Sequence, residues 1–338
     1  KMFYSKEKKL NFNDVLIIPK SSQLNSRKDV ILDTNISFPN SSFDWLGVPI
    51  MASNMDNVGT FEMGLALQKF HITNAVSKFY DKKAWVKYIN KGLDPEYNFI
   101  TFGLEKVSEI DEIISFISQK TNKGIKTIVF DIPNGYIDKF SRTISDTRKQ
   151  FPNLGIIAGN VVTPEGVKIL MDSGADGVKV GIGSGGVCDT TETTGIGYPQ
   201  LSAVIECSEE VKKYNGFVVS DGGVKITGDI SKAFAAGAGF VMLGSLLAAH
   251  KESMAPIIRK DNKNYRELYG MSSTKAMTKH YGEVADYRTS EGKSILVEDR
   301  GPVKNTVNEI LGALRSTCTY INSKNIGEIY QNSSFIIL

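Results

Sequence analysis

Eight short apolar runs recur through the first three quarters of the chain and constrain its fold more than any other feature. Each run ends in, or is followed by, Gly, Asn, Asp or Ser, and stretches with helical periodicity separate them. This alternation predicts parallel strands joined by helices, and eight such units close a (β/α)8 TIM barrel, an α/β fold whose sites lie at the carboxyl ends of the strands. The predicted strands cover residues 48–53, 72–77, 98–103, 127–131, 155–158, 177–180, 217–220 and 240–243.

The length and composition fit one large domain. A chain of 338 residues with 41% apolar side chains can bury a single large core, and a decorated barrel fits that size better than two ordinary domains. We therefore predict a single barrel domain over residues 1–338. Helical spacing over 107–121 and 199–213 predicts two of the crossovers, and Thr163 followed by Pro164 is typical of a helix N-terminus.

The segment after the last predicted strand has a different character. Residues 251–300 are mostly polar, with clustered Gly, Ser and Lys and weak periodicity, and a predicted helix over 303–315 follows them. A long excursion at the mouth of a barrel is typical of an active-site lid. We expect residues 251–300 to form a mobile lid within the barrel domain.

Charge and cysteine content narrow the class of protein. The 40 basic and 37 acidic residues give a net charge of +3, which is too balanced to indicate a nucleic-acid surface. No stretch reaches the roughly 20 apolar residues that span a membrane, and the first residues are charged rather than apolar. The three cysteines form no close pair, so we expect neither a disulfide framework nor a zinc site, and we favour a cytoplasmic protein.

A glycine-rich loop after the sixth predicted strand leads to a cysteine, in the stretch Gly181-Ile182-Gly183-Ser184-Gly185-Gly186-Val187-Cys188. Glycines allow the main chain to approach a ligand or ion closely. A lone cysteine usually packs as a small apolar side chain, but this one follows a barrel strand on a polar loop, so we favour a nucleophilic thiol. Cys207 is expected in the core, and Cys318 is left undecided with packing favoured.

Two further loops have the composition of a phosphate site. Ser220-Asp221-Gly222-Gly223 follows the seventh predicted strand, and Gly244-Ser245 follows the eighth. In many barrels these two loops bind phosphate through main-chain N–H groups. We favour Asp221 as an acceptor for ribose hydroxyls, with capping of the following turn as the alternative.

The other titratable residues give weaker signals. None of the histidines, His71, His250 and His280, has metal-ligand spacing, and His71 is expected to be structural. Glu291 lies on a polar loop, where a glutamate is usually only solvated. Its spacing alone therefore does not mark it as a general acid or base.

Five stretches of the chain carry a family resemblance. They are Asn-Met-Asp-Asn-Val-Gly-Thr-Phe-Glu-Met at 54–63, Ala-Gly-Asn-Val-Val-Thr at 158–163, Thr-Gly-Ile-Gly-Tyr-Pro-Gln-Leu-Ser-Ala-Val at 194–204, Tyr-Gly-Met-Ser-Ser at 269–273 and Leu-Arg-Ser-Thr-Cys-Thr-Tyr at 314–320. In this order they resemble the IMP dehydrogenase/GMP reductase family, and its reductases most closely. The chain has no room for the regulatory domain usual in the dehydrogenases, and Tyr287-Arg288 reverses the Arg-Tyr pair of their hydrolytic flap.

The resemblance implies an oxidoreductase that converts GMP and NADPH to IMP, ammonia and NADP. Cys188 would attack purine C2 and form a covalent thioimidate, which accepts a hydride before the thiol leaves. Thr190 and Glu291 match the residues that deliver a proton to the departing ammonia in the family. The choice of NADPH rests on the resemblance, since no Rossmann fingerprint occurs.

The resemblance also implies binding residues. For GMP these are Asp221, Gly222, Gly223, Gly244, Ser245, Gly270, Met271, Ser272, Arg288, Ser290, Glu291 and Gly292. For NADPH they are Ser26, Arg27, Lys78, Asp131, Ile132, Pro133, Ile182, Gly183, Met271, Tyr287, Arg288, Ser316, Thr317, Cys318 and Thr319. Ser26 and Arg27 match positions that reach the cofactor of a neighbouring subunit, which implies a homotetramer with shared sites. A monovalent cation such as K⁺ is implied near Gly181, Gly183 and Cys188.

The chain departs from the family pattern directly after the cysteine. The reductases usually have Thr-Thr-Arg there with a lysine soon after, whereas this chain has Asp189-Thr190-Thr191-Glu192-Thr193. Acidic side chains in place of basic ones should disfavour the thiolate and repel an anionic nucleotide, so we expect rate, ion dependence or substrate preference to differ. Ser184 also stands where the family commonly has proline.

Three alternatives stay open at this point. An IMP dehydrogenase would reduce NAD with IMP, and it needs a hydrolytic base that the sequence does not reveal. A flavin-dependent barrel oxidoreductase would use the same two phosphate loops for FMN. A nucleotide-binding protein that has lost turnover would bind GMP without converting it.

Overall fold

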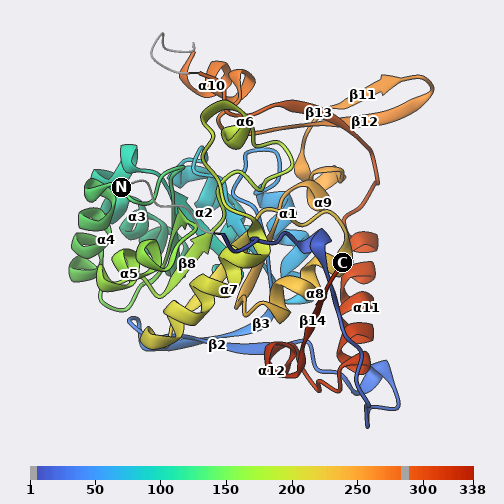
Figure 1. Cartoon of the computed structure of the whole chain (residues 1–338). Helices are drawn as coiled ribbons and strands as arrows, with labels where there is room; N and C mark the ends of the chain where they lie inside the picture. The colour runs from blue at the N-terminus through green and yellow to red at the C-terminus, as the bar shows by residue number, and fades with distance from the viewer. Residues whose placement is uncertain (1–5, 283–288) are drawn as a thin grey trace.

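A computed structural model, which describes residues 6–282 and 289–338, has the predicted barrel (Figure 1). Eight parallel strands close into a ring because β10 pairs with β3 as well as with β9, with Val241 opposite both Ile50 and Ser220. The strands are β3 (Phe43–Ala52), β4 (Ile72–Val76), β5 (Asn98–Phe102), β6 (Thr127–Asp131), β7 (Gly155–Val161), β8 (Gly177–Val180), β9 (Phe217–Asp221) and β10 (Phe240–Leu243).

The predicted strand positions are confirmed, and the differences lie at the strand ends. The predictions for β6, β8 and β10 match to the residue, while β3 begins five residues early, at Phe43 rather than at residue 48. The extra residues of β3 pair with β2 (Thr34–Phe38) in an antiparallel hairpin. A pattern of eight parallel strands does not predict this antiparallel partner, which lies outside the ring.

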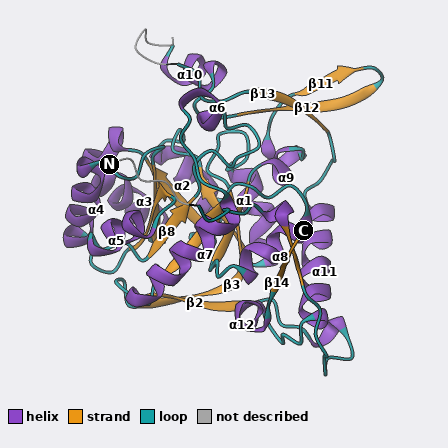
Figure 2. Cartoon of the chain, in the orientation of Figure 1, coloured by secondary structure: helices purple, strands orange, loops and turns teal. Residues whose placement is uncertain are grey.

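Helices surround the strands, as Figure 2 shows. The crossovers contain α1 (Phe61–Leu67), α2 (Lys82–Asn90), α3 (Ile110–Thr121), α4 (Asp138–Gln150), α5 (Pro164–Asp172), α6 (Thr190–Thr194), α7 (Gln200–Val211) and α8 (Thr227–Ala235). Thr163 caps α5 as predicted, because its side chain accepts a hydrogen bond from the main-chain N–H of Gly166. After the barrel, α11 (Lys304–Tyr320) packs against α8 and α1 and completes the ring of helices.

The hairpin of β2 and β3 covers the amino-terminal end of the barrel. Its buried side chains Phe38 and Trp45 join the apolar residues that fill the barrel interior, among them Phe217 and Phe240. A larger apolar layer separates the outer face of the strands from the helices. With the amino-terminal end filled, the opposite end is where a ligand can enter.

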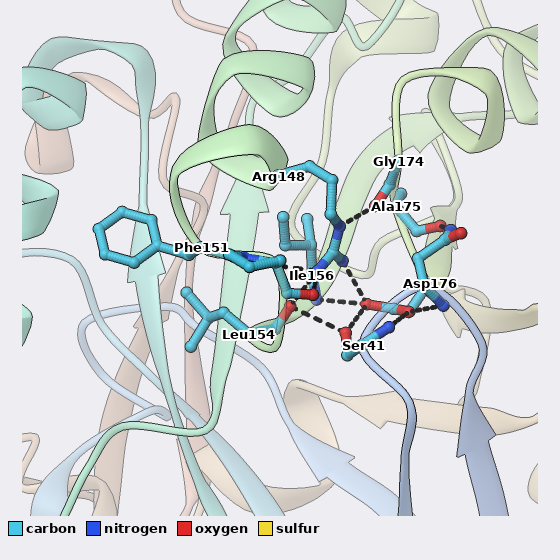
Figure 3. A network of polar contacts seen from close by, with 10 residues as sticks. Ser41, Arg148, Phe151, Leu154, Ile156, Gly174, Ala175 and Asp176 are labelled. Carbon is cyan, nitrogen blue, oxygen red and sulfur yellow. Dashed lines mark hydrogen bonds and ion pairs between the residues drawn. The ribbon is translucent and has the colours of Figure 1, made fainter.

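A buried ion pair fastens this hairpin to the barrel (Figure 3). The side chain of Asp176, just before β8, accepts hydrogen bonds from the main-chain N–H groups of Asn40, Ser41 and Ile156 and from the Ser41 hydroxyl. Arg148 of α4 donates to the same carboxylate at 2.7 Å. Its guanidinium also donates to the main-chain carbonyls of Phe151, Pro152, Leu154 and Gly174.

The excursion between β10 and α11 is more regular than its sequence suggested. Within the described part of residues 251–300, a three-stranded antiparallel sheet of β11 (Ile257–Lys260), β12 (Lys263–Tyr269) and β13 (Ser294–Glu298) projects from the barrel mouth, next to helix α10 (Thr274–Tyr281) (Figure 1). The sequence concealed these strands because no apolar alternation marks them. Strand β11 is mostly exposed, β13 alternates between exposed and partly buried residues, and β12 is buried only in its second half, where Arg266 is among the buried residues. The mobility of this segment remains a prediction.

Two short strands near the chain ends pair with each other on the outside of the barrel. Strand β1 (Val15–Ile17) pairs with β14 (Phe335–Ile337), and the short helices α9 (Ser245–Ala248) and α12 (Ile329–Asn332) complete the fold. Over residues 6–282 and 289–338, the structure contains no helix with the length and apolar character needed to cross a membrane.

Candidate active site

A cavity of about 710 Å³ opens at the carboxyl ends of the barrel strands. It is lined by residues at the carboxyl ends of all eight barrel strands or in the loops after them, together with residues of the excursion around Met271, Met277 and Glu291. This is the end at which the (β/α)8 fold carries its ligand sites. The cavity is therefore the candidate active site.

Cys188 lies at this cavity, partly exposed, at the end of the glycine-rich loop after β8. Two glycines of the loop need their conformational freedom. Gly183 has φ +80°, and a Cβ there would lie 2.0 Å from the Thr191 hydroxyl oxygen. At Gly181 a Cβ would lie 1.8 Å from the Asp221 carbonyl oxygen. Both positions exclude any side chain, which lets the loop fold tightly against the strand ends.

The thiol stands in a chain of three polar groups. The Cys188 Sγ lies 3.3 Å from the Thr190 Oγ1, and the Thr190 hydroxyl donates to the Glu291 Oε2 at 2.9 Å. Glu291 and Cys188 are far apart in sequence and meet because residues 291–293 run beside the cysteine loop. A hydroxyl between a thiol and a carboxylate can move a proton between them.

Main-chain hydrogen bonds fix that alignment. The N–H of Asp189 donates to the carbonyl of Glu291 at 2.8 Å, and the N–H of Lys293 donates to the carbonyl of Val187 at 3.1 Å. On its other side, the N–H of Glu291 donates to the carbonyl of Ser272 at 3.1 Å. Residues 291–293 thus act as a short strand between the cysteine loop and the loop of Met271.

A cation from outside the cysteine loop offsets its acidic side chains. The Nζ of Lys293 lies 3.2 Å from the Asp189 Oδ1, and this ion pair raises the pKa of Lys293. The Cys188 side chain lies close enough to contribute to that shift. The loop itself has no basic residue, but the neighbouring segment brings Lys293 beside it, which a count of residues adjacent in sequence does not include. The expected change in rate, ion dependence or substrate preference stays a prediction.

The two predicted phosphate loops lie at the same cavity. Gly222 and Gly223 have φ of +98° and +79°, and the Gly223 N–H donates to the Ser184 carbonyl at 2.9 Å, which joins this loop to the cysteine loop. Gly244 and Ser245 begin helix α9 and also line the cavity. The left-handed conformation at two successive residues explains why this loop contains a glycine pair.

A buried polar network forms the floor of the cavity. The Nζ of Lys179, on β8, makes ion pairs with the carboxylates of Asp131 and Asp221, the latter at 3.1 Å. Asn54 donates to Asp131 at 2.8 Å, and Asn160 donates to Asp221 at 2.9 Å. Although burial favours the neutral acid, Lys179 and Asn54 hold the pKa of Asp131 below its usual value.

Helix α10 is fastened over the cavity by a carboxylate from the loop after β3. The Oδ2 of Asp56 accepts hydrogen bonds from the Tyr269 hydroxyl at 2.8 Å, the Lys279 Nζ at 2.8 Å and the His280 Nε2 at 2.6 Å. Burial opposes the charge on Asp56, but these donors outweigh it and lower its pKa. The His280 ring also stacks on Phe79, with 3.4 Å between centroids.

We expect Asp56→Asn to release α10. Loss of the shared carboxylate removes charged hydrogen bonds, which should lower the free energy of local opening of α10 by about 2 kcal/mol. Amide hydrogen exchange over residues 274–282 should then be roughly thirtyfold faster. The pKa of Asp56 is lowered in the folded protein. The attachment of α10 should therefore be fully present at pH values above the usual pKa of an aspartate, and it should weaken as the pH falls toward the lowered pKa.

Asp44→Asn serves as the matched control for this experiment, since Asp44 is an exposed acid on the hairpin at the opposite end of the barrel. Exchange over α10 should be unchanged in that variant. Equal exchange rates in Asp56→Asn and the wild type would contradict the fastening role of Asp56.

The structure brings most of the predicted site residues together. The residues of the predicted catalytic, GMP, NADPH and cation sets that line the cavity are Lys78, Asp131, Ile132, Pro133, Gly181, Ile182, Gly183, Cys188, Thr190, Asp221, Gly222, Gly223, Gly244, Ser245, Gly270, Met271, Ser272 and Glu291. Ser290 and Gly292 flank Glu291 without lining the cavity, and the Ser290 hydroxyl donates to the Gly292 carbonyl at 2.9 Å. Tyr287 and Arg288 lie outside the described residues.

A second group of predicted cofactor residues lies away from the cavity. Ser26 and Arg27 lie at a short 3-10 helix, and Ser316, Thr317, Cys318 and Thr319 belong to α11. Arg315 joins the two segments by donating to the Arg27 carbonyl at 3.3 Å. Cys318 is fully buried, which raises the pKa of its thiol to about 12, so its side chain packs as favoured. Cys207 is buried as predicted.

Sequence reasoning missed Lys179, Asn54 and Asn160. Lys179 follows Val178 in an apolar strand, where a single lysine is conspicuous because a buried charge needs a partner. That signal could have marked it as a partner of strand-end carboxylates. Asn54 and Asn160 lie within the stretches that carry the family resemblance, but nothing in their spacing showed what they contact.

Comparisons with known proteins agree with this geometry. Residues 9–338 match the family described as IMP dehydrogenase / GMP reductase domain. The chain is 47% identical over 330 residues to the GMP reductase of Phytophthora infestans, covering 98% of this chain and 91% of that protein. It is 46% identical over 331 residues to GMP reductase 2 of Homo sapiens and 44% identical over 330 residues to the GMP reductase of Salmonella typhi, each time covering 97% of this chain and 94% of the relative.

Proposed function

The chain belongs to the IMP dehydrogenase/GMP reductase family, and from this premise we propose that it acts as a GMP reductase, an oxidoreductase that converts GMP to IMP and ammonia with NADPH. The observation that carries the proposal is the contact chain from Cys188 through Thr190 to Glu291 at the mouth of the barrel. It supplies a nucleophile and a route for a proton at one point of a cavity large enough for a nucleotide.

In the proposed reaction the Cys188 thiolate adds to C2 of the guanine ring. The C2–N bond then breaks, the 2-amino group leaves as ammonia after gaining a proton, and the purine remains attached to sulfur as a thioimidate. NADPH supplies a hydride to C2 when bound beside this adduct. The C–S bond finally breaks, which releases IMP and restores the thiolate, so the cysteine takes part in both halves without net change.

Thr190 and Glu291 are proposed to handle the proton for the departing ammonia. The hydroxyl of Thr190 lies between the sulfur and the Glu291 carboxylate, so it can pass a proton toward the atoms attached at C2. Ammonia departs far more readily than an amide anion, so this proton is needed in the first half of the reaction. Hydride addition does not need it.

We expect Thr190→Val to lower kcat with GMP and NADPH by about 10²-fold, because a methyl group replaces the hydroxyl of the proton path without changing size. The measurement is steady-state oxidation of NADPH. Thr191→Val is the matched control, since the neighbouring hydroxyl donates only to the Ile196 carbonyl. If both variants stayed within threefold of the wild type, Thr190 would have no part in proton transfer.

The two glycine loops and Asp221 are proposed to hold the nucleotide. The loops that contain Gly222, Gly223, Gly244 and Ser245 suit a phosphate, although the N–H of Gly223 itself is bonded to the Ser184 carbonyl, and Asp221 suits the ribose hydroxyls. Gly270, Met271, Ser272, Ser290 and Gly292 belong to the segments that cover the purine side of this position, with Arg288 predicted to join them. Binding at three places would fix C2 next to the Cys188 sulfur.

The cavity also has room for the nicotinamide end of NADPH. Lys78, Asp131, Ile132 and Pro133 line the side away from the glycine loops, and Lys78 forms an ion pair with Glu105 at 2.5 Å. A buried acceptor without a partner, the Oδ1 of Asn160, lies at the same cavity and suits an amide or hydroxyl donor. These groups fit a ligand that carries both charge and hydrogen-bond donors.

The remaining predicted cofactor residues support a homotetramer with shared sites. Ser26, Arg27 and the stretch from Ser316 to Thr319 lie next to one another through Arg315, but away from the cavity of their own chain. They would therefore serve the cofactor of a neighbouring subunit.

The proposed monovalent cation, K⁺, would be bound by main-chain oxygens near Gly181, Gly183 and Cys188. The Gly181 carbonyl accepts one hydrogen bond, from Asn160 at 2.7 Å, which leaves a lone pair for the ion.

The experiment that tests the proposal compares two substrate pairs on the purified protein. We expect NADPH oxidation with GMP and no NAD reduction with IMP, because the dehydrogenase reaction needs a hydrolytic base. Reduction of NAD with IMP would instead establish the dehydrogenase reaction. A colourless protein would exclude bound flavin.

A further inference from the structure

We propose that Lys179 is a positioning residue, which holds Asp131 and Asp221 with one buried ammonium group and so couples the cofactor side of the cavity to its nucleotide side. The proposal rests on the proposed function, because it uses the different ligands predicted for the two carboxylates. In the proposed function Lys179 contacts neither GMP nor NADPH. It acts through Asp131 and Asp221, which are proposed to contact them.

The geometry of Lys179 is unusual for a lysine. Only 1% of its side chain is exposed, and it points between the ends of strands β6 and β9 rather than to solvent. Its Nζ contacts both carboxylates and lies 3.5 Å from the Asn54 Oδ1. All three hydrogens of the ammonium group therefore have an acceptor, which is the condition for burying a charge.

The negative charges of Asp131 and Asp221 are both balanced by the ammonium group of Lys179. The groups are one buried ammonium and two partly exposed carboxylates, so without Lys179 two negative charges would lie close together with no cation between them. The amide groups of Asn54 and Asn160 each donate to one carboxylate but carry no charge. Lys179 is the one cation that contacts both acids in the part of the chain that the structure describes.

Because the two carboxylates share one ammonium group, a ligand that binds to one of them affects the other. When a ribose donates to Asp221, that carboxylate gives up part of its interaction with the ammonium, which can then move closer to Asp131. A change at Asp131 has the reverse effect. The two halves of the site, on opposite sides of the cavity floor, therefore communicate through a single side chain.

The other charged groups around Asp131 do not replace Lys179. Lys78, on the loop after β4, acts on Asp131 through space but is paired with Glu105, and Tyr281 of α10 acts on Lys78. Asp221, across the ammonium, adds a negative charge. Removal of Lys179 should therefore raise the pKa of Asp131, so that an activity requiring its carboxylate fails at a higher pH than in the wild type.

The test uses Lys179→Met, with Lys168→Met as the matched control, since Lys168 is an exposed lysine paired with Asp172 on the surface of α5. We expect Lys179→Met to raise the KM of both GMP and NADPH at least tenfold and to move the acidic limb of the pH–rate profile to higher pH. Lys179→Arg keeps the charge, and its acidic limb should stay at the wild-type position. Lys168→Met should leave all of these values unchanged.

Combination with Asp131→Asn distinguishes positioning from general structural support. If Lys179 acts through Asp131, the double variant should lose no more activity than the worse single variant. The proposal would be overturned if the activity lost in the double variant equalled the product of the losses in the two single variants. KM values for Lys179→Met within twofold of the wild type would overturn it as well. A wild-type protein without turnover would be a failure of the proposed function instead.

Should Lys179→Met not fold, Asp131→Asn alone decides the question. In that variant Asp221 is the one carboxylate left to the ammonium, which draws it away from the ribose. The Kd of GMP, measured by calorimetry without NADPH, should then rise at least threefold although Asp131 lies on the cofactor side. A Kd within twofold of the wild type would overturn the coupling.

Discussion

Cys188→Ala should abolish GMP-dependent oxidation of NADPH, with a fall in kcat of about 10⁴-fold or more. No other thiol can replace it, because Cys207 and Cys318 are buried and burial raises the pKa of both. The Kd of GMP should stay within about threefold, since the glycine loops and Asp221 are untouched. Steady-state kinetics and calorimetry on the same preparation measure the two quantities.

Cys207→Ala is the control, because this cysteine is fully buried in α7 and far from the cavity. It should keep the wild-type kcat, and alkylation that inactivates the wild type should occur at Cys188 and be slowed by GMP. Turnover that survives in Cys188→Ala would mean that the reaction has no covalent step on this residue.

The second large effect concerns stability rather than chemistry. Asp176→Asn should lower the free energy of unfolding by about 3 kcal/mol, because it leaves the largely buried Arg148 guanidinium without its counter-ion. The carboxylate of Asp176 is fully buried and accepts hydrogen bonds from the hairpin of β2 and β3 as well as from β7. An amide would turn an NH2 group toward several of these donors. Urea unfolding followed by circular dichroism measures the change.

Asp172→Asn provides the comparison four residues earlier in the chain. Asp172 is about half exposed and pairs with Lys168, so its removal should change stability by less than about 1 kcal/mol. The catalytic constants of folded Asp176→Asn should match the wild type, since the network lies at the opposite end of the barrel from the cavity. A loss of stability no larger than that of Asp172→Asn would contradict the role of this network.

The barrel could be predicted because its signal is local. Each strand is a short apolar run that is buried on both faces, and this leaves the same mark wherever it occurs. In the projecting sheet, β11 and β13 have no fully buried residue and β12 is buried only in its second half, where Arg266 is among the buried residues, so its strands leave no such mark. Its pairing depends on register between segments almost thirty residues apart, such as Leu268 with Ile295.

Within the site, what could be predicted depended on sequence distance. Cys188 and the glycine loops were found because each motif is continuous. The alignment of Glu291 with Thr190 spans 101 residues and rests on main-chain hydrogen bonds that no composition encodes. The same holds for Lys293 beside Asp189 and for His280 on Asp56, which lie 104 and 224 residues apart.

Release of ammonia tests the central claim most directly. Purified protein, GMP and limiting NADPH would be incubated to completion, and ammonia, IMP and oxidised cofactor would be measured on the same sample. We predict one ammonia and one IMP for each NADPH oxidised, and none of the three products with Cys188→Ala. Oxidation of NADPH without ammonia, or ammonia from the Cys188→Ala variant, would contradict reductive deamination through Cys188.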